Sequence, residues 1–181
     1  MNRITSFSLA IALFFLSGLI KAQAQNSTLH VEISGAFTMK KDFNTDIIWR
    51  QLTAQTKIDT NATFGFFTGR SAAIPFYFSC VLVDIPSKKI GPGTFSVVEV
   101  KNDIPTSDTI KKGGFIAIKL NKRNVARQDE YISVPGTGNT IIILSVNGTV
   151  VNGSFNTFMQ CTNDEKKIIN VKGTFRIITK K

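Results

Sequence analysis

The sequence has few of the side chains on which most enzymes depend. It holds one histidine, His30, and two cysteines, Cys80 and Cys161, in 181 residues. A Ser-His-Asp or Cys-His system would have to use His30, which lies between Leu29 and Val31 near the start of the predicted domain. A zinc site needs three or four closely spaced ligands. These shortages predict a protein that is not an enzyme and that carries no metal or other cofactor.

Paired carboxylates of the kind that glycosidases use are equally hard to find. Asp129-Glu130 and Asp164-Glu165 are adjacent in the sequence, and neighbours on a strand point to opposite faces. Each pair is more typical of a solvated turn than of an acid and base that share one substrate. A hydrolase that uses Asp129 or Glu130 is therefore the least favoured function.

Only one long apolar run occurs, and it lies at the N-terminus. A positive start at Met1-Asn2-Arg3 precedes the apolar residues 4–20, and Lys21-Ala22-Gln23-Ala24 fits the A-x-A cleavage pattern. We predict a signal peptide over residues 1–24 and a single all-β domain over 25–181, exported to the periplasm or the extracellular space. An uncleaved anchor is the alternative, although about 17 apolar residues is at the short limit for a spanning helix. No transmembrane segment is expected in the mature chain.

No stretch shows a convincing helical period, whereas short alternating stretches bounded by Gly, Pro and Asn recur. Predicted strands cover residues 29–39, 47–58, 62–67, 74–84, 94–100 and 115–120, and a three-stranded meander follows from residue 140. Segment 101–108 is predicted as a polar loop, and segment 121–135 as an irregular segment that forms either a short helical turn over residues 125–130 or a long hairpin tip. The fold class is all-β, an antiparallel β-sandwich of about nine strands, with a lipocalin-like closed barrel as the alternative.

The side-chain phase of several strands can be predicted. Asn147-Gly148 is the strongest hairpin signal, and a two-residue turn there sets the register of the flanking strands. The residues that this register places on the core face are Ile142, Leu144, Val151 and Phe155. The matching core rows in two other strands are Phe76, Phe78, Cys80 and Leu82, and Ile169, Val171, Phe175 and Ile177. Lys172, Thr174 and Arg176 are predicted to face water.

A Gly-Ser/Thr-Phe motif recurs along the chain. It stands at Gly93-Thr94-Phe95, Gly153-Ser154-Phe155 and Gly173-Thr174-Phe175, with a looser copy at Gly35-Ala36-Phe37. Glycine leaves room for a large ring from a neighbouring strand to lie over the backbone. A phosphate-binding loop would need a following helix N-terminus, so the motif predicts packing rather than a ligand site.

These motifs, together with Trp49 on the second predicted strand and Asn147-Gly148, resemble those of small exported proteins of Bacteroidetes-type bacteria that form a domain-of-unknown-function family. The resemblance covers most of the chain after residue 25. It implies an all-β exported domain with no established activity and no defined site. The chain departs from many such proteins because it has no lipobox cysteine near the cleavage point, which favours a soluble periplasmic or released form.

The two cysteines allow two states. Export to an oxidising compartment favours a Cys80–Cys161 disulfide, which would close a loop of roughly 80 residues and stabilise the fold by about 4 kcal/mol. Two buried free thiols are the alternative, since unpaired cysteines are common in cores.

The chain is basic, with a net charge of +10, two units of which belong to Arg3 and Lys21 in the expected leader. Ten of the 22 basic residues come in five lysine doublets, and such doublets keep sheet proteins soluble and their edges unpaired. Binding to an anionic surface is the alternative. No doublet is interleaved with aromatic residues, so we expect no nucleic-acid partner. The densest basic contact patch is predicted at Lys119, Lys122, Arg123 and Arg127.

Two non-catalytic functions fit these observations. The first is a binding module for a small apolar ligand or a glycan, held in a barrel mouth or on a sandwich face and suggested by the Phe-rich segments 64–67 and 76–78. The second is a structural or protein-interaction component of the cell envelope. We expect a monomer whose partner is a ligand or an envelope component. The sequons at Asn26, Asn61, Asn147 and Asn152 would mark glycosylation only in a eukaryotic secretory pathway.

Overall fold

A computed structural model describes residues 26–44, 47–51, 63–68, 76–84, 90–101, 104–105, 112–120 and 129–179. The predicted signal peptide lies outside the described residues. Every regular element within them is a β-strand. In chain order the strands are β1 (Thr28–Gly35), β2 (Met39–Phe43), β3 (Ile47–Gln51), β4 (Thr63–Thr68), β5 (Phe76–Asp84), β6 (Gly93–Ser96), β7 (Val100–Lys101), β8 (Ile104–Pro105), β9 (Lys112–Leu120), β10 (Glu130–Ser133), β11 (Thr140–Asn147), β12 (Val150–Cys161) and β13 (Asp164–Ile178).

Eleven of these strands form one sheet in the order β2-β1-β13-β12-β10-β9-β5-β4-β3, with β11 paired to β12 and β6 paired to β11. All strand pairs in it are antiparallel, apart from an isolated parallel bridge between Val97 and Gly114. Strands β7 and β8 form a separate small pair. The predicted all-β antiparallel class is confirmed. The sheet is largely open, because its end strands β2 and β3 are not paired with each other in the described part of the chain.

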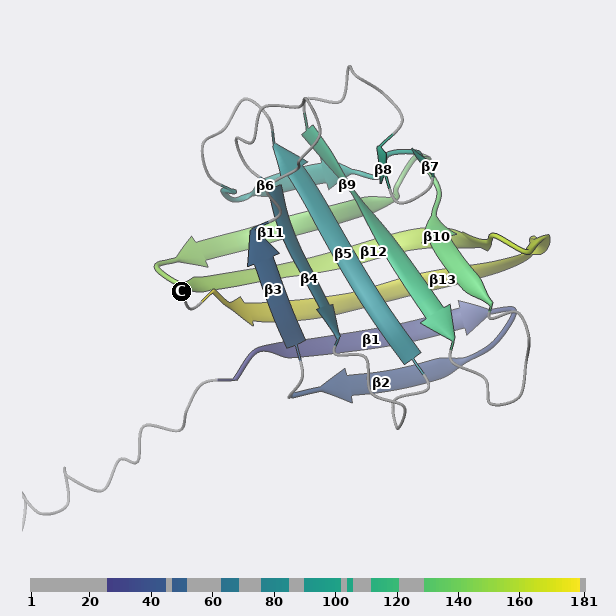
Figure 1. Cartoon of the computed structure of the whole chain (residues 1–181), viewed down its shortest axis with the longest axis horizontal. Coiled ribbons are helices and arrows are strands. Elements are labelled where there is room, and N and C mark those ends of the chain that lie inside the picture. The colour runs from purple at the N-terminus through teal and green to yellow at the C-terminus, as the bar shows by residue number, and fades with distance from the viewer. Residues whose placement is uncertain are drawn as a thin grey trace, which may run out of the picture.

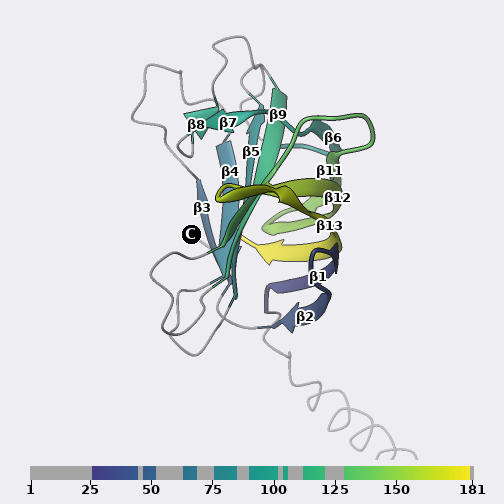
Figure 2. The same cartoon turned by 90° about the vertical axis from the view of Figure 1, so that its right-hand side faces the viewer.

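The sheet bends so that one part of it lies across the other. Figure 1 shows β3, β4, β5 and β9 running steeply across β11, β12, β13, β1 and β2. We call the first group the crossing layer and the second, with β6, the meander layer. Figure 2 shows the two layers face to face. Strand β10 joins them, since it pairs with β9 on one side and with β12 on the other.

Aromatic rings from both layers meet between them. Phe66 of β4 lies 4.7 Å, centroid to centroid, from Phe175 of β13, and Phe78 of β5 lies 5.3 Å from Phe155 of β12. All four rings are buried, and each contributes about 1.5–3 kcal/mol relative to an exposed position. The Phe-rich segments 64–67 and 76–78 therefore supply most of their rings to the core.

Two of the Gly-Ser/Thr-Phe motifs pack against each other. Gly153 pairs with Phe175, and Phe155 pairs with Gly173, across β12 and β13. A Cβ atom on Gly153 would overlap the ring of Phe175, and one on Gly173 would overlap the ring of Phe155 and the carbonyl oxygen of His30. The prediction that these glycines make room for neighbouring rings is confirmed.

The register of the β11–β12 hairpin differs from the prediction. Asn147 pairs with Val150, so the two connecting residues are Gly148 and Thr149, and Gly148 supplies the positive φ of +58°. A β-bulge between Ile143 and Ser145 then shifts the pairing again. As a result Ile141 and Ile143 fill the core, whereas Ile142 is half-buried on the opposite side and Leu144 is 62% exposed.

The predicted core positions of Ile142 and Leu144 are therefore wrong, because the bulge, which has no sequence signal of its own, inverts which residues of β11 face the core. The predicted core positions of Val151 and Phe155 are confirmed, as are those of the two other rows. In the last strand Lys172 and Thr174 are exposed and Arg176 is half-buried, all on the outward side.

Four strands occur where the sequence indicated none or only part of one. The segment 29–39 is not one strand, because Gly35, with φ of +114°, ends β1 and a turn leads into β2. Strand β10 lies within the predicted irregular segment 121–135, where buried Tyr131 anchors it to the core. The pair β7–β8 begins at Val100, the last residue of the predicted strand 94–100, and otherwise lies in the predicted loop 101–108. The estimate of about nine strands was therefore too low.

Candidate functional site

The outward side of the meander layer is a continuous polar surface, since alternate residues of its strands point away from the core. Cross-strand pairing arranges these residues in rows. We call this surface the polar face and define it by two such rows: Ser154, Thr174, His30 and Asp42, and next to it Asn156, Lys172, Glu32 and Lys40. In Figure 2 it is the side of the meander layer turned away from β5 and β9.

Glu32 is at the centre of the ion pairs on this face. Its Oε1 lies 2.9 Å from Lys40 Nζ, and its Oε2 lies 3.0 Å from Lys172 Nζ, so both oxygens accept charge-assisted hydrogen bonds. His30 Nε2 also lies 3.3 Å from Oε1. The hydrogen bonds from Lys40, Lys172 and His30 lower the pKa of Glu32 to about 2. The carboxylate is therefore ionised throughout the physiological range.

His30 is held between two carboxylates. Its Nδ1 contacts the carboxylate of Asp42 and its Nε2 that of Glu32. Both ring nitrogens can donate at once only in the protonated imidazolium. The hydrogen bond to Asp42, then that to Glu32, raises the pKa of His30 above its usual 6.5. The ring therefore favours the charged form and has no nitrogen left to act as a general base.

A hollow of about 320 Å³ opens at the end of the polar face nearest the β1–β2 turn. Its volume is at the lower end of the range found for small-ligand sites. The residues that line it are Glu32, Ile33, Ser34, Thr38, Met39, Lys40, Asn170 and Lys172. It therefore offers carboxylate, ammonium, amide and hydroxyl groups within one small concave surface.

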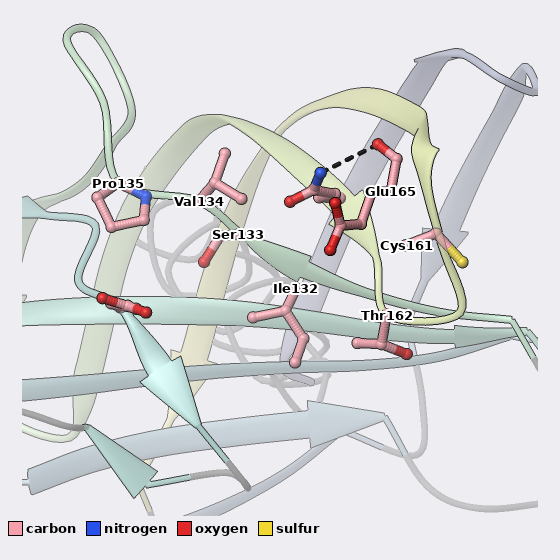
Figure 3. Close-up of a pocket in the computed structure, with 9 residues that line it drawn as sticks. Ile132, Ser133, Val134, Pro135, Cys161, Thr162 and Glu165 are labelled. Carbon is pink, nitrogen blue, oxygen red and sulfur yellow. Dashed lines mark hydrogen bonds between the residues drawn. The ribbon is translucent and has the colours of Figure 1, made fainter.

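A second hollow of about 320 Å³ lies between β10 and the β12–β13 turn. Figure 3 shows Ile132, Ser133, Val134 and Pro135 on one side and Cys161, Thr162 and Glu165 on the other. Its polar groups are part of the framework: Ser133 Oγ accepts the Ile116 N–H at 2.9 Å, and Gln160 Nε2 donates to the Glu165 carbonyl at 3.0 Å. The sole histidine, His30, contacts Asp42 and Glu32 and does not line this hollow, so Ser133 has no imidazole base.

The two cysteines are not bonded to each other. Cys80 on β5 and Cys161 on β12 are both free and buried. Burial alone raises the pKa of the Cys80 thiol well above its ordinary range. The predicted disulfide is therefore absent from the structure, and the alternative of two buried core thiols is the one observed.

The predicted basic patch is described only at its first member. Lys119 forms an ion pair of 3.3 Å with Glu130, while Lys122, Arg123 and Arg127 lie outside the described residues. One charge of the patch is therefore already balanced by a carboxylate.

The adjacent carboxylates do not form an acid–base pair in the described structure. Asp129 and Asp164 both approach Lys167 Nζ, at 3.7 Å and 3.9 Å, and Glu130 is bound to Lys119. Both aspartates therefore lie in ion pairs with one lysine. These groups act as surface ion pairs.

The remaining predicted positions are scattered. Among the sequons, Asn26 and Asn147 are exposed and Asn152 is half-buried, donating to Ser145 Oγ at 3.0 Å; Asn61 lies outside the described residues. Within the described ranges, no group of three or more His, Cys, Asp and Glu side chains is placed to hold a metal ion. No helix in those ranges is long and apolar enough to span a membrane.

Sequence reasoning missed the polar face. His30 stands out in the sequence as the only histidine, but its contact with Asp42 and the contact of Glu32 with Lys172 both join separate strands. The available signal was the alternation of Thr28–Gly35 followed, after a short turn, by Met39–Phe43, which would have placed His30 opposite Asp42. The contact with Lys172 depends on pairing β1 with β13, which no local pattern indicates.

Comparison of the chain with protein-family models, with curated proteins and with solved structures finds no match.

Proposed function

We propose that this protein is an exported, non-catalytic binding module whose ligand is a glycan rather than a small apolar molecule. One observation carries the proposal. The polar face combines ionised, amide and hydroxyl side chains around a hollow, whereas the aromatic rings that suggested an apolar cavity, Phe66 and Phe78, are packed against other rings. Sugars bring hydroxyl donors and acceptors that such a surface can pair with.

The proposal also covers the fold class, the export and the family resemblance of the protein. The two-layer arrangement is best classed as a β-sandwich, since the sheet is largely open and the layers pack through their inner faces. The leader-like residues 1–24 favour export. The resemblance to exported proteins of a domain-of-unknown-function family rests on motifs that here serve packing, so it supports the fold class more than a site.

The test is binding of the intact protein after signal-peptide removal to an immobilised panel of neutral and acidic glycans, alongside fluorescent fatty-acid probes. We expect retention on at least one glycan and no saturable probe binding. Saturable binding of an apolar probe with no glycan retained would overturn the proposal.

A protein-interaction role in the cell envelope is the second candidate. It is favoured by large apolar side chains on the surface, notably Leu144, which is 62% exposed, and Ile168, which is 50% exposed. Pull-downs from envelope extract at low salt, compared between the wild type and Leu144→Asp, test it. A protein recovered by the wild type and lost in the variant would support this role, and identical recovery would count against it.

A further inference from the structure

An exposed aromatic ring lies beside the hollow of the polar face. Phe158 on β12 is 51% exposed and stands opposite Asn170 on β13, which lines the hollow. Asn170 stands in turn opposite Ser34 on β1, also a lining residue. With neighbouring strands about 4.8 Å apart, this row of three residues spans about 10 Å. The ring and the hollow are therefore close enough to contact one ligand.

The polar groups along this row suit hydroxyl recognition. Asn170 Nδ2 lies 3.3 Å from Asn156 Oδ1, so that contact fixes the orientation of its amide. Glu32 presents two oxygens with about four acceptor positions, of which the lysines and His30 occupy three. Glu32 therefore keeps one acceptor position, and the Asn170 amide offers its oxygen and its second N–H, so the row presents both acceptors and a donor to neighbouring hydroxyl groups.

The charges around the hollow are nearly balanced. Glu32 lies between Lys40 and Lys172, and His30 is paired with Asp42. An anionic ligand drawn to the lysines would meet the Glu32 carboxylate, and a cationic ligand would meet the lysines. A neutral ligand avoids both repulsions and can still donate to Glu32 and accept from Lys40 and Lys172.

We propose that a neutral oligosaccharide binds at this place, with the apolar face of one sugar ring on Phe158 and the hydroxyl groups of the next in the hollow. The inference rests on the proposed glycan-binding function and adds its position and the charge class of its ligand. The aromatic ring supplies contact area at little entropic cost, and the hollow supplies orientation.

Isothermal titration calorimetry of the intact mature protein with neutral β-glucan, mannan and xylan fragments, uronic-acid oligosaccharides and inorganic phosphate tests this inference. We expect binding of a neutral oligosaccharide whose affinity changes less than about twofold between low and high salt. Phe158→Ser should weaken it about tenfold, and Asn170→Ala should weaken it to a similar degree. Both positions are on the surface, and circular dichroism checks that the variants are folded.

Leu144→Ser is the matched control, because Leu144 is also an exposed apolar residue, and its neighbours Ile143 and Ser145 pair with Gly153 and Asn152, at the end of β12 away from Phe158. It should leave the affinity unchanged. Neutral binding that survives both Phe158→Ser and Asn170→Ala would overturn the inference while leaving glycan binding intact. Stronger, salt-sensitive binding of uronic-acid oligosaccharides or phosphate would overturn the inference that the ligand is neutral. Failure of the wild type to bind any sugar would overturn the proposed function itself.

Discussion

At the scale of single residues, His30 is the most informative side chain, because it is the only histidine and its magnetic resonance signal is unambiguous. Its contacts with Asp42 and Glu32 raise its pKa above 6.5. We expect Asp42→Asn to lower that pKa more than Glu32→Gln does, since the hydrogen bond to Asp42 is the larger cause. Proton NMR titration of the imidazole measures both. Equal pKa values in the wild type and Asp42→Asn would contradict the observed pairing.

The same contacts predict how stability depends on pH. The raised pKa of His30 stabilises the fold fully below 6.5, and this contribution is lost as pH rises through the folded-state value. The lowered pKa of Glu32 stabilises the fold above 4.5, and this contribution is lost as pH falls toward about 2. We therefore expect the network to contribute most between pH 4.5 and 6.5. The effect is small, because both groups are exposed. Urea midpoints of the wild type and His30→Gln, compared across pH, check this window.

Gly173 leaves little room for a side chain. A Cβ atom there would overlap the His30 carbonyl oxygen and the Phe155 ring. We expect Gly173→Ala to destabilise the protein by at least about 1–3 kcal/mol through overpacking. Gly91→Ala is the control, since a Cβ atom at Gly91 meets nothing within 4 Å, and it should change stability by less than about 0.5 kcal/mol. Denaturant unfolding of the two variants distinguishes them.

At the scale of elements, strand β11 shows where sequence patterns succeed and where they fail. Period-two alternation correctly placed the core rows of β5 and β13, because both strands run without interruption. In β11 the run Ile141-Ile142-Ile143-Leu144 is apolar at every position, so hydrophobicity alone cannot select a phase. The bulge then decides it. The hairpin β1–β2 and strand β10 were missed because their anchors, Gly35 and Tyr131, act through distant strands.

Because of the bulge, substitutions at two neighbouring residues of β11 should change the free energy of unfolding by very different amounts. Ile143 is buried and Leu144 is 62% exposed, although both are large and apolar. We expect Ile143→Ser to cost about 3 kcal/mol or more through the lost burial and the buried hydroxyl. Leu144→Ser should stay within about 0.5 kcal/mol. Thermal unfolding measures the difference. A larger loss of stability in Leu144→Ser than in Ile143→Ser would support the register predicted from the sequence, in which Leu144 faces the core.

At the scale of the whole molecule, the core thiols report how the two layers open. Cys80 belongs to the crossing layer and Cys161 to the meander layer, and both are buried in one cluster. We expect a thiol reagent to modify neither cysteine in the native protein and to reach both in a single step on unfolding, because β10 ties the layers together. A reducing agent should leave the melting temperature unchanged. Rapid labelling of one cysteine alone under native conditions would show that the layers open separately.

The candidate site was harder to predict than the fold, because its residues come from strands that are distant in the sequence. The alternation that defines each strand is local, so most strands were found from the sequence. The polar face is assembled from β12, β13, β1 and β2, and Glu32 and Lys172 meet only because the first and last strands pair. Charge counts alone suggested a basic patch at Lys119, which the structure shows to be paired with Glu130.

The pairing of β1 with β13 also affects when the protein can fold during its synthesis. Strand β13 lies between β12 and β1. The meander layer therefore lacks a central strand until the fifteen residues of β13 have been synthesised. Until then β1 has no partner on that side, and Leu29, Val31 and Ile33 have no core row to pack on. We therefore expect a nascent chain of this sequence to complete its core only after its C-terminal strand is released. That delay is consistent with the proposed export, in which a polypeptide crosses the membrane before it folds.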